Sequence, residues 1–372
     1  MKYRIIIVDD SALYRLLVKR AISKFSDLEI LYEASDGKEA LAQIKKLKPD
    51  FVISDVEMPV MNGLELLKNI KKEKINVGVI MLSGASRRNA NITIEALSLG
   101  AFDFIEKPTA GNPNSNFDHI GNEIHEKLLL YKSVNKRVTA SSARQARNRV
   151  VSKPVKKIED KKRPLRESSR PIRTRATKSS VLSHYDLILV GISTGGPKTL
   201  IKVFSELKKT LPVPMLIVQH MPPMFTKSLA ENLDKKSSNT VKEAADGEIT
   251  KPGHVYIAPG GKHLELEQAG SGYRLKITNR PPVNSCKPSV DTLFKSAKSI
   301  VQKKKVLVMV LTGMGRDGRD GVKDIKSTNT TVIAQDEETS IIYGMPKAVV
   351  DANLHDEKMS IDEIINLLNS LW

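Results

Sequence analysis

A serine, a histidine and an aspartate each stand at or just after the end of a short apolar run in this 372-residue chain. Ser193 lies in Gly191-Ile192-Ser193-Thr194-Gly195, which fits the G-x-S-x-G pattern of a nucleophile on a sharp turn between a strand and a helix. A helix is predicted to begin at Pro197, because proline suits the first helical turn. Free N–H groups at such a helix start bind a developing oxyanion, so this turn predicts a hydrolase nucleophile.

A serine nucleophile needs a base and a group that orients the base. His220 ends the apolar run 215–220, and Asp317 follows the run 306–311. In an open α/β sheet, functional sites assemble at the carboxyl ends of the strands, where all three residues are predicted to lie. Taken singly, each has an ordinary structural role, a strand-end histidine or an aspartate at a turn. Together, the three residue types favour catalysis.

Other patterns in the same region are weaker. Gly191 and Gly196 have the spacing of a phosphate-binding loop, but Pro197 stands where the loop pattern requires lysine. The run 315–321 lacks the ligand spacing of a calcium loop. Cys286, the single cysteine, excludes an internal disulfide, suits a reducing cytoplasm and is expected to be a bystander thiol in a loop.

A second group of reactive residues lies near the N-terminus. Asp9 and Asp10 close one predicted strand, Asp55 closes another, and Ser83 and Lys107 end two more. Three converging carboxylates repel one another unless a hard cation neutralises them, and oxygen ligands favour Mg²⁺. An aspartate beside Mg²⁺ and an ammonium group can accept a phosphoryl group, because this transfer depends on positioning and charge neutralisation.

The basic residues are concentrated in one segment. The net charge is +18, and residues 131–180 hold 17 basic and three acidic side chains. This segment is also rich in serine, threonine and proline, so it is predicted to be a disordered basic linker. It divides the chain into a domain over 1–130 and a domain over 181–372. The N-terminus lacks a signal-peptide core, and a cytoplasmic location is expected.

Strand and helix patterns alternate through the first domain, as in a doubly wound parallel sheet. An apolar stripe through Phe117, Ile120, Ile124 and Leu128 predicts its last helix. The predicted strands cover residues 4–8, 29–33, 51–54, 77–82 and 102–105. The fold class is therefore α/β, with a second parallel-sheet domain after the linker.

Residues 1–130 resemble the response-regulator receiver domain, which implies a flavodoxin-like fold. The resemblance makes Asp55, in Ser-Asp-Val-Glu-Met-Pro, the phosphoacceptor. Asp9 and Asp10 would bind Mg²⁺ together with it. Three further residues would form the phosphorylation switch: Ser83, which binds the phosphoryl group, Lys107, which pairs with it, and Phe104, the aromatic that changes rotamer.

The second domain resembles the chemotaxis receptor methylesterases, the protein-glutamate methylesterase (CheB) family. The resemblance rests on Gly-Ile-Ser-Thr-Gly-Gly, Gln-His-Met-Pro, Thr-Gly-Met-Gly-Arg-Asp-Gly, Pro288-Ser289-Val290-Asp291 and related stretches. It implies a Rossmann-like three-layer domain with an added β-hairpin. The order serine, histidine, aspartate also differs from that of the α/β-hydrolases.

By this resemblance the protein demethylates glutamate γ-methyl esters on chemotaxis receptors, releases methanol and, as in some members, deamidates receptor glutamines. Ser193, His220 and Asp317 would form the triad, and the N–H groups of Thr194 and Met314 the oxyanion hole. No cofactor is expected in this domain. The implied partners are a histidine kinase and the receptors, with the protein a monomer at the periphery of membrane receptor arrays.

The contact between the two domains and the basic linker lead to two further expectations. Without phosphate on Asp55, the receiver is expected to rest against the esterase edge and limit access to Ser193. The linker is longer and more basic than the family pattern suggests; it is either a solvated spacer or a segment attracted to acidic receptor helices or anionic lipid.

The alternative functions are a catalytically silent adaptor that drains phosphoryl groups, and a DNA-binding regulator. Specific nucleic acid binding is not expected, because the second domain shows no helix-turn-helix pattern.

Overall fold

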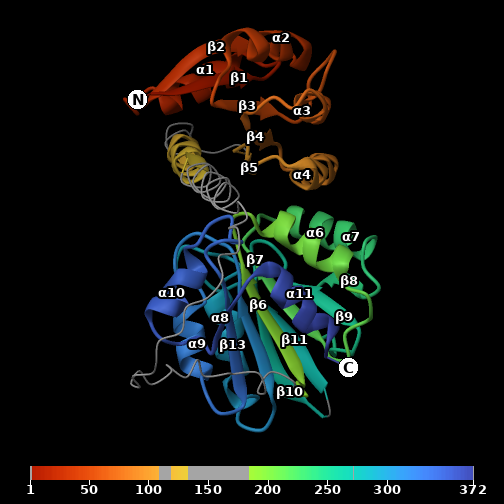
Figure 1. Ribbon diagram of the computed structural model, residues 1–372. Coiled ribbons are helices and arrows are strands. Elements are labelled where there is room, and N and C mark those ends of the chain that lie inside the picture. The colour runs from red at the N-terminus through yellow and green to blue at the C-terminus, as the bar shows by residue number, and fades with distance from the viewer. Residues whose placement is uncertain (1, 109–118, 133–183, 271, 372) are drawn as a thin grey trace, which may run out of the picture.

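The computed structural model describes residues 2–108, 119–132, 184–270 and 272–371, which form two α/β domains (Figure 1). Most of the predicted linker, from residue 133 onward, lies outside the described residues, as does Phe117 of the predicted helical stripe. Within the described ranges, no helix is long and apolar enough to cross a membrane.

The N-terminal domain is a five-stranded parallel sheet in the order β2-β1-β3-β4-β5, which confirms the predicted doubly wound, flavodoxin-like fold. Its apolar strand residues alternate between two clusters, one under α1 and the helix over 119–132, the other under α2, α3 and α4. A side-chain oxygen of Ser11, Asp36, Asn62 or Ser86 caps the start of each of the four labelled helices. The elements are β1 (Tyr3–Val8), α1 (Ala12–Ile22), β2 (Leu28–Ala34), α2 (Gly37–Leu47), β3 (Phe51–Asp55), α3 (Gly63–Lys72), β4 (Gly78–Ser83), α4 (Arg87–Leu99) and β5 (Asp103–Glu106).

The C-terminal domain is a seven-stranded, wholly parallel sheet in the order β14-β13-β12-β6-β7-β9-β8. One face is covered by α6, α7 and α11, the other by α8, α9 and α10, which confirms three layers. The predicted extra hairpin is β10 and β11, which pair antiparallel. The elements are β6 (Leu187–Ile192), α6 (Gly196–Glu206), β7 (Met215–Gln219), α7 (Phe225–Asp234), β8 (Thr240–Glu243), β9 (His254–Ile257), β10 (His263–Ala269), β11 (Gly272–Thr278), α8 (Val290–Ser296), β12 (Val306–Val310), α9 (Arg319–Ile325), β13 (Thr330–Gln335), α10 (Met345–Asp351), β14 (Glu357–Met359) and α11 (Ile361–Asn369).

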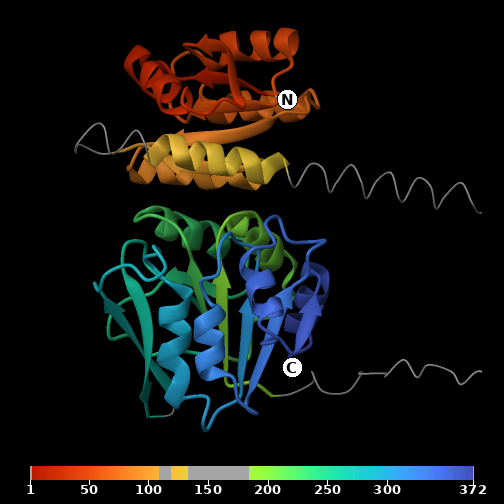
Figure 2. The same ribbon diagram turned by 90° about the vertical axis from the view of Figure 1, so that its left-hand side faces the viewer.

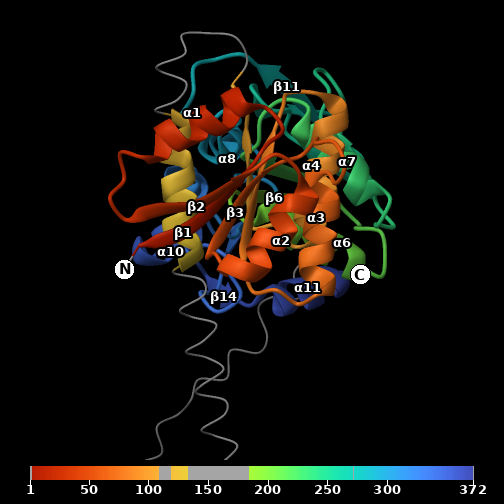
Figure 3. The ribbon, with the colours of Figure 1, turned by 90° about the horizontal axis from the view of Figure 1, so that it is seen from above.

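The two domains pack through α4 of the first and α6 and α7 of the second. The ring of Phe104 stacks on that of Phe225, with centroids 4.5 Å apart and planes inclined by 22°. Arg87 pairs with Glu231 at 2.8 Å across the same contact. The helix over 119–132 lies on the opposite face of the first sheet from α4 (Figure 1), and like α4 it lies on the side of its domain turned toward the second domain (Figure 2). From above, the N-terminal domain covers one end of the C-terminal domain (Figure 3).

Candidate active site and acidic cluster

Ser193 lies on a tight turn between the end of β6 and the start of α6. The turn closes through Gly195, whose φ of +79° is a left-handed conformation that glycine adopts without strain. The Ser193 N–H donates to the carbonyl of Thr312 at 2.9 Å, which ties the turn to the end of β12. A Cβ atom added to Gly313 would lie 2.8 Å from the Ser193 Cβ, so the neighbouring loop can approach this closely only with glycine there.

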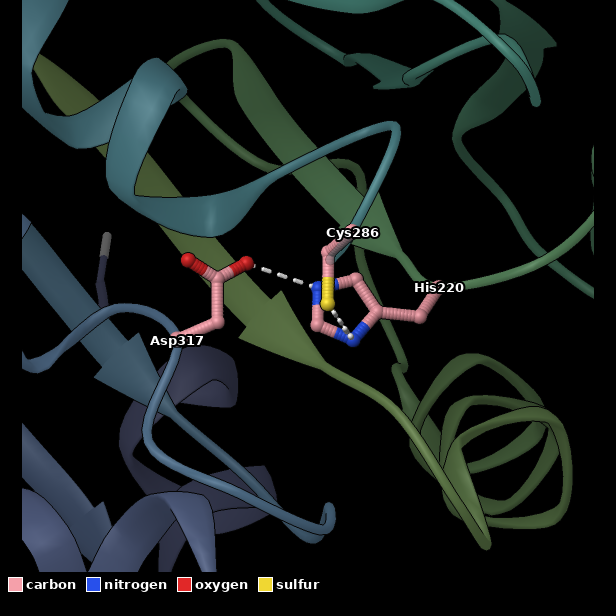
Figure 4. A group of neighbouring side chains, drawn as sticks. All are labelled: His220, Cys286 and Asp317. Atoms are coloured by element: carbon pink, nitrogen blue, oxygen red, sulfur yellow. Dashed lines mark hydrogen bonds and ion pairs between the residues drawn. The ribbon is translucent and has the colours of Figure 1, made fainter. Parts of the chain in front are cut away.

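His220 and Asp317 lie close together at the carboxyl ends of β7 and β12, as the sequence predicts. The Nε2 atom of His220 is 2.8 Å from Oδ2 of Asp317 (Figure 4). The carboxylate has no proton to donate, so the ring donates from Nε2 and its basic nitrogen is Nδ1. No hydrogen bond joins the Ser193 hydroxyl to His220 among the described residues, although both side chains line one cavity of about 910 Å³.

Asp317 is held by a set of donors that the sequence analysis did not single out. Its Oδ2 accepts the Val290 N–H at 2.7 Å, and its Oδ1 accepts the Ser289 hydroxyl at 2.9 Å and the Asp291 N–H at 3.1 Å. The Asn284 amide bridges Oδ1 of Asp317, at 3.2 Å, and Oδ2 of Asp291, at 2.7 Å. The motif Pro288-Ser289-Val290-Asp291 was the available signal for three of these residues. Together these donors fix the carboxylate that orients the imidazole.

His220 and Asp317 each shift the pKa of the other. Burial lowers the pKa of His220, but its hydrogen bond with Asp317 and its contact with Cys286 outweigh burial and raise that pKa to about 9. Burial raises the pKa of Asp317, but the hydrogen bonds from His220 and from the Val290 and Asp291 N–H groups lower it to about 2. The resting pair is therefore an imidazolium beside a carboxylate at neutral pH.

Gln219 joins the serine turn to the histidine turn. Its side-chain amide donates to the carbonyl of Ser193 at 3.0 Å and to the carbonyl of His220 at 3.2 Å. The residue is 2% exposed, and its Oε1 atom packs against Gly196, where an added Cβ would lie only 1.9 Å from it. Gln219 thus fixes the spacing of the two turns, and the motif Gln-His-Met-Pro contained it.

Thr194 and Met314 both line the cavity that contains Ser193. The described part of the chain gives neither backbone N–H a hydrogen-bond partner, so both remain available as donors. The Thr194 carbonyl accepts the Thr312 hydroxyl at 3.0 Å, which fixes the orientation of this peptide. The Met314 side chain is 42% exposed, so it does not serve as core packing.

Cys286 lies in a loop, as predicted, but not apart from the site. Its Sγ atom is 3.7 Å from Nδ1 of His220 (Figure 4). The same atom is 3.4 Å from the carbonyl oxygen of Asn284. The thiol therefore contacts the basic nitrogen of the candidate triad, and the expectation that it takes no part in catalysis stays a prediction.

The N-terminal domain gathers its predicted acidic residues at the carboxyl edge of its sheet. Carboxylate oxygens of Asp9, Asp10 and Asp55 lie within 4.8 Å of one another. Lys107 Nζ is 2.7 Å from Asp9 and 2.8 Å from Asp55. Burial raises the pKa of Asp55 despite the lysine, and the two carboxylates raise the pKa of Lys107 despite burial. One ammonium for three carboxylates leaves negative charge and free oxygen ligands, which fit a hard divalent cation such as Mg²⁺.

The remaining predicted residues of this domain occupy two different environments. Ser83 is fully buried, and its hydroxyl accepts a hydrogen bond from the Thr93 hydroxyl at 2.8 Å. Phe104 is 7% exposed because it packs against Phe225 of the second domain. Ser83 therefore lies under α4, and Phe104 forms part of the domain contact.

Two family models of known proteins match separate parts of the chain. The family model for the response regulator receiver domain matches residues 5–113, and the CheB methylesterase model matches residues 188–368.

Full-length relatives are similar along nearly the whole chain. A Desulfotalea psychrophila protein named protein-glutamate methylesterase/protein-glutamine glutaminase is 39% identical over 363 residues, covering 97% of this chain and 96% of that protein. A Bacillus licheniformis protein of the same name is 40% identical over 362 residues, with the same coverage. The crystal structure of the Thermotoga maritima CheB methylesterase catalytic domain covers 50% of this chain and 99% of that domain, with 41% identity and a TM-score of 0.48.

Proposed function

This chain belongs to the CheB methylesterase family and has an N-terminal response-regulator receiver domain, and from that premise we propose that it is a phosphorylation-activated protein-glutamate methylesterase. Its substrates are glutamate γ-methyl esters on chemotaxis receptors, and receptor glutamines by deamidation. A histidine kinase supplies the phosphoryl group. The protein acts as a cytoplasmic monomer at the receptor arrays.

One observation carries the proposal for the esterase domain. The oriented His220–Asp317 pair and the buried turn of Ser193 lie at one edge of the sheet, and Ser193 and His220 line one cavity. Thr194 and Met314, whose N–H groups have no partner within the described structure, line the same cavity. A nucleophile, a base, an orienting carboxylate and oxyanion donors are the parts that acyl transfer requires.

The acylation step uses the ring nitrogen that faces away from Asp317. Ser193 Oγ attacks the ester carbonyl carbon as His220 Nδ1 takes the hydroxyl proton. The N–H groups of Thr194 and Met314 stabilise the oxyanion, and Asp317 stabilises the imidazolium. The tetrahedral intermediate then collapses, the carbon–oxygen bond to methoxide breaks, and Nδ1 returns the proton so that methanol leaves.

The acyl-enzyme is hydrolysed by the same groups. A water molecule attacks the acyl carbon as His220 Nδ1 takes its proton, and the bond to Ser193 Oγ breaks as the serine regains a proton. The receptor keeps a free glutamate. With a glutamine substrate the leaving group is ammonia, and the second step is identical.

In the receiver domain, Asp55 accepts the phosphoryl group, with Asp9 and Asp10 completing the acidic cluster. Bound Mg²⁺ would neutralise charge on the phosphoryl oxygens. Lys107 would pair with the new phosphate, and Ser83 would turn its hydroxyl from Thr93 toward it. That change would alter the packing around Phe104, which lies against Phe225.

The cavity explains how phosphorylation would control hydrolysis. It is bordered by Lys107 and Glu123 of the receiver and by Ser193 and His220 of the esterase. A receptor helix must enter between the two domains to reach Ser193. The resting contact between α4 and α7 therefore limits access, and a phosphoryl group on Asp55 relieves the limit.

We expect methanol release from methylated receptor to rise when a phosphodonor and Mg²⁺ are added to the intact protein, and not to rise with Asp55→Asn. The measurement is the initial rate of methanol release, with the fragment 184–372 as a reference for an unobstructed site. A fragment no faster than the unphosphorylated intact protein would show that the receiver does not obstruct the site.

We also expect hydrolysis by the intact protein to increase with pH, with a midpoint near 9, the raised pKa of His220. Below that pH the protonated Nδ1 cannot take the serine proton, and above it the neutral ring can. The pH profile of kcat/KM reports this group in the free enzyme. A midpoint at the ordinary histidine value of 6.5 would contradict the assigned environment of His220.

A further inference from the structure

A second cavity, of about 220 Å³, adjoins the cavity that Ser193 lines. Leu130, Met314 and Gly315 line both of them, so the two cavities are neighbours. The rest of its lining comes from residues 341–344. The proposed acyl transfer uses none of these four residues, so the hydrolysis itself gives the second cavity no role.

The wall of the second cavity is tied to the loop after β12. The Gly313 N–H donates to the carbonyl of Ile342 at 3.0 Å, and the Gly344 N–H donates to the carbonyl of Gly313 at 3.1 Å. Ile341 packs against the serine turn, since a Cβ atom added to Gly195 would lie 2.6 Å from the Ile341 Cβ. The cavity is therefore held at a fixed place beside the nucleophile.

The lining of this cavity is apolar. Among the described residues, its members other than glycine are Leu130, Met314, Ile341, Ile342 and Tyr343, none of which is charged. Ile341 and Tyr343 are half-buried, so part of their surface stays accessible. Covering apolar surface with an apolar partner is favourable, whereas an unpaired charge buried there is costly. The cavity therefore fits an apolar side chain.

The position of the cavity suits a helical substrate. On an α-helix, residues three or four apart lie on one face, with Cβ atoms about 5–6 Å apart. A receptor helix whose ester reaches Ser193 presents those neighbouring side chains to the same surface. Because Met314 lines both cavities, a neighbouring side chain can enter the second cavity while the ester occupies the first.

We propose that the second cavity is a specificity subsite, which binds an apolar side chain three or four residues from the esterified glutamate. The inference rests on the proposed function and adds a feature of its substrate. Leu130 belongs to the helix over 119–132, so the resting receiver borders the subsite as well as the catalytic cavity. The substrate side chain takes the place of Leu130 when the receiver moves away.

The first test uses helical peptides that carry one glutamate γ-methyl ester. In one series the third and fourth residues before the ester are leucine or glutamine, and in the other series the third and fourth residues after it. Both residue types are good helix formers, so the comparison does not change helicity. With a phosphodonor and Mg²⁺ present, leucine should raise kcat/KM by about 10- to 100-fold over glutamine, the gain from burying one large apolar side chain.

The subsite lies on one side of Ser193, so the leucine preference should occur in one series only. Equal kcat/KM for the leucine and glutamine peptides in both series would overturn the subsite.

Ile341→Asp places a charge in the subsite and should remove the leucine preference. It should still hydrolyse N-acetylglutamate γ-methyl ester, which is too short to reach the subsite, at the rate of the unaltered protein. Ile249→Asp is the matched control, because Ile249 is 39% exposed and lines neither cavity. It should keep the full preference.

Ile341→Ala is a smaller change that introduces no charge, and it should weaken the leucine preference. A full preference in both Ile341 variants would overturn the subsite. An equal loss of activity toward the short ester and the leucine peptide would also overturn it, because that result would show that Ile341 only supports the Ser193 turn.

Binding of the same peptides to Ser193→Ala, measured by fluorescence anisotropy with the phosphodonor and Mg²⁺ present, separates this inference from the proposed function. The leucine peptide of the preferred series should bind more tightly than its glutamine counterpart. A leucine preference in Kd without ester hydrolysis by the unaltered protein would support the subsite and contradict the proposed function. Ester hydrolysis without any leucine preference would contradict the subsite alone.

Discussion

Ser193→Ala should reduce methyl-ester hydrolysis by about 10⁴- to 10⁶-fold, because it removes the atom that forms the acyl-enzyme. The residual rate would come from the oxyanion donors and from substrate binding. The measurement is methanol release from methylated receptor under phosphorylating conditions, where obstruction by the receiver is relieved.

Ser205→Ala is the matched control for that variant. Ser205 lies on α6, the helix that follows the Ser193 turn, is exposed, and its hydroxyl donates only to the carbonyl of Lys202 within the described structure. Its hydrolysis should equal that of the unaltered protein. Phosphorylation of Asp55 should persist in Ser193→Ala, which shows that the chain is folded. A loss of less than about tenfold in Ser193→Ala would place the nucleophile elsewhere.

Asp317→Asn should lower kcat by about 10⁴-fold, the cost when an asparagine holds the catalytic histidine in the wrong tautomer. The carboxylate position is surrounded by donors from Ser289, Val290 and Asp291. An amide NH₂ group there must turn toward the ring and donate to Nε2. Nδ1 would then carry the proton and could not accept one from Ser193.

The effect of Asp317→Asn should fall on kcat rather than on KM, because Asp317 does not contact the substrate. Asp320→Asn is the matched control, since Asp320 is a nearby, partly exposed carboxylate paired with Arg319. It should leave both constants unchanged. An Asp317→Asn enzyme within about tenfold of the unaltered kcat would show that the carboxylate does not set the tautomer.

Strand ends were the part of the site that the sequence could predict. Short apolar runs bounded by glycine, aspartate or histidine locate buried parallel strands, and parallel strands place their carboxyl ends at one edge. The sequence alone therefore predicts that Ser193, His220 and Asp317 lie at the same edge of the sheet. The acidic residues Asp9 and Asp55 followed from the same rule in the first domain.

The conformation of the loop that holds Cys286 could not be predicted from the sequence, because hydrophobic periodicity carries no information about loops. Asn284 and Ser285 both adopt positive φ, of 51° and 62°, and this turn directs Cys286 toward His220. Neither residue type demands that conformation; tertiary contacts such as the bond from Asn284 to Asp291 hold it. The sequence therefore predicted a loop position for Cys286 but not its contact with His220.

The domain contact was equally hidden. The resemblance made Phe104 the aromatic that changes rotamer, and nothing in the sequence singled out Phe225, since a sequence does not distinguish an apolar side chain buried within a domain from one buried between two. Only the structure pairs them across the interface.

The stack of Phe104 on Phe225 has a consequence for timing. Phe104, the ring that would respond to the phosphoryl group, is itself part of the contact with the esterase domain. No further conformational step would therefore separate phosphorylation of Asp55 from loosening of the domain contact. The open interval would then last only as long as the acyl phosphate on Asp55 survives. If Asp55 is phosphorylated as proposed, the number of esters removed per phosphoryl group would equal the turnover rate multiplied by the lifetime of the aspartyl phosphate. That lifetime would then limit how much each phosphorylation event demethylates the receptors.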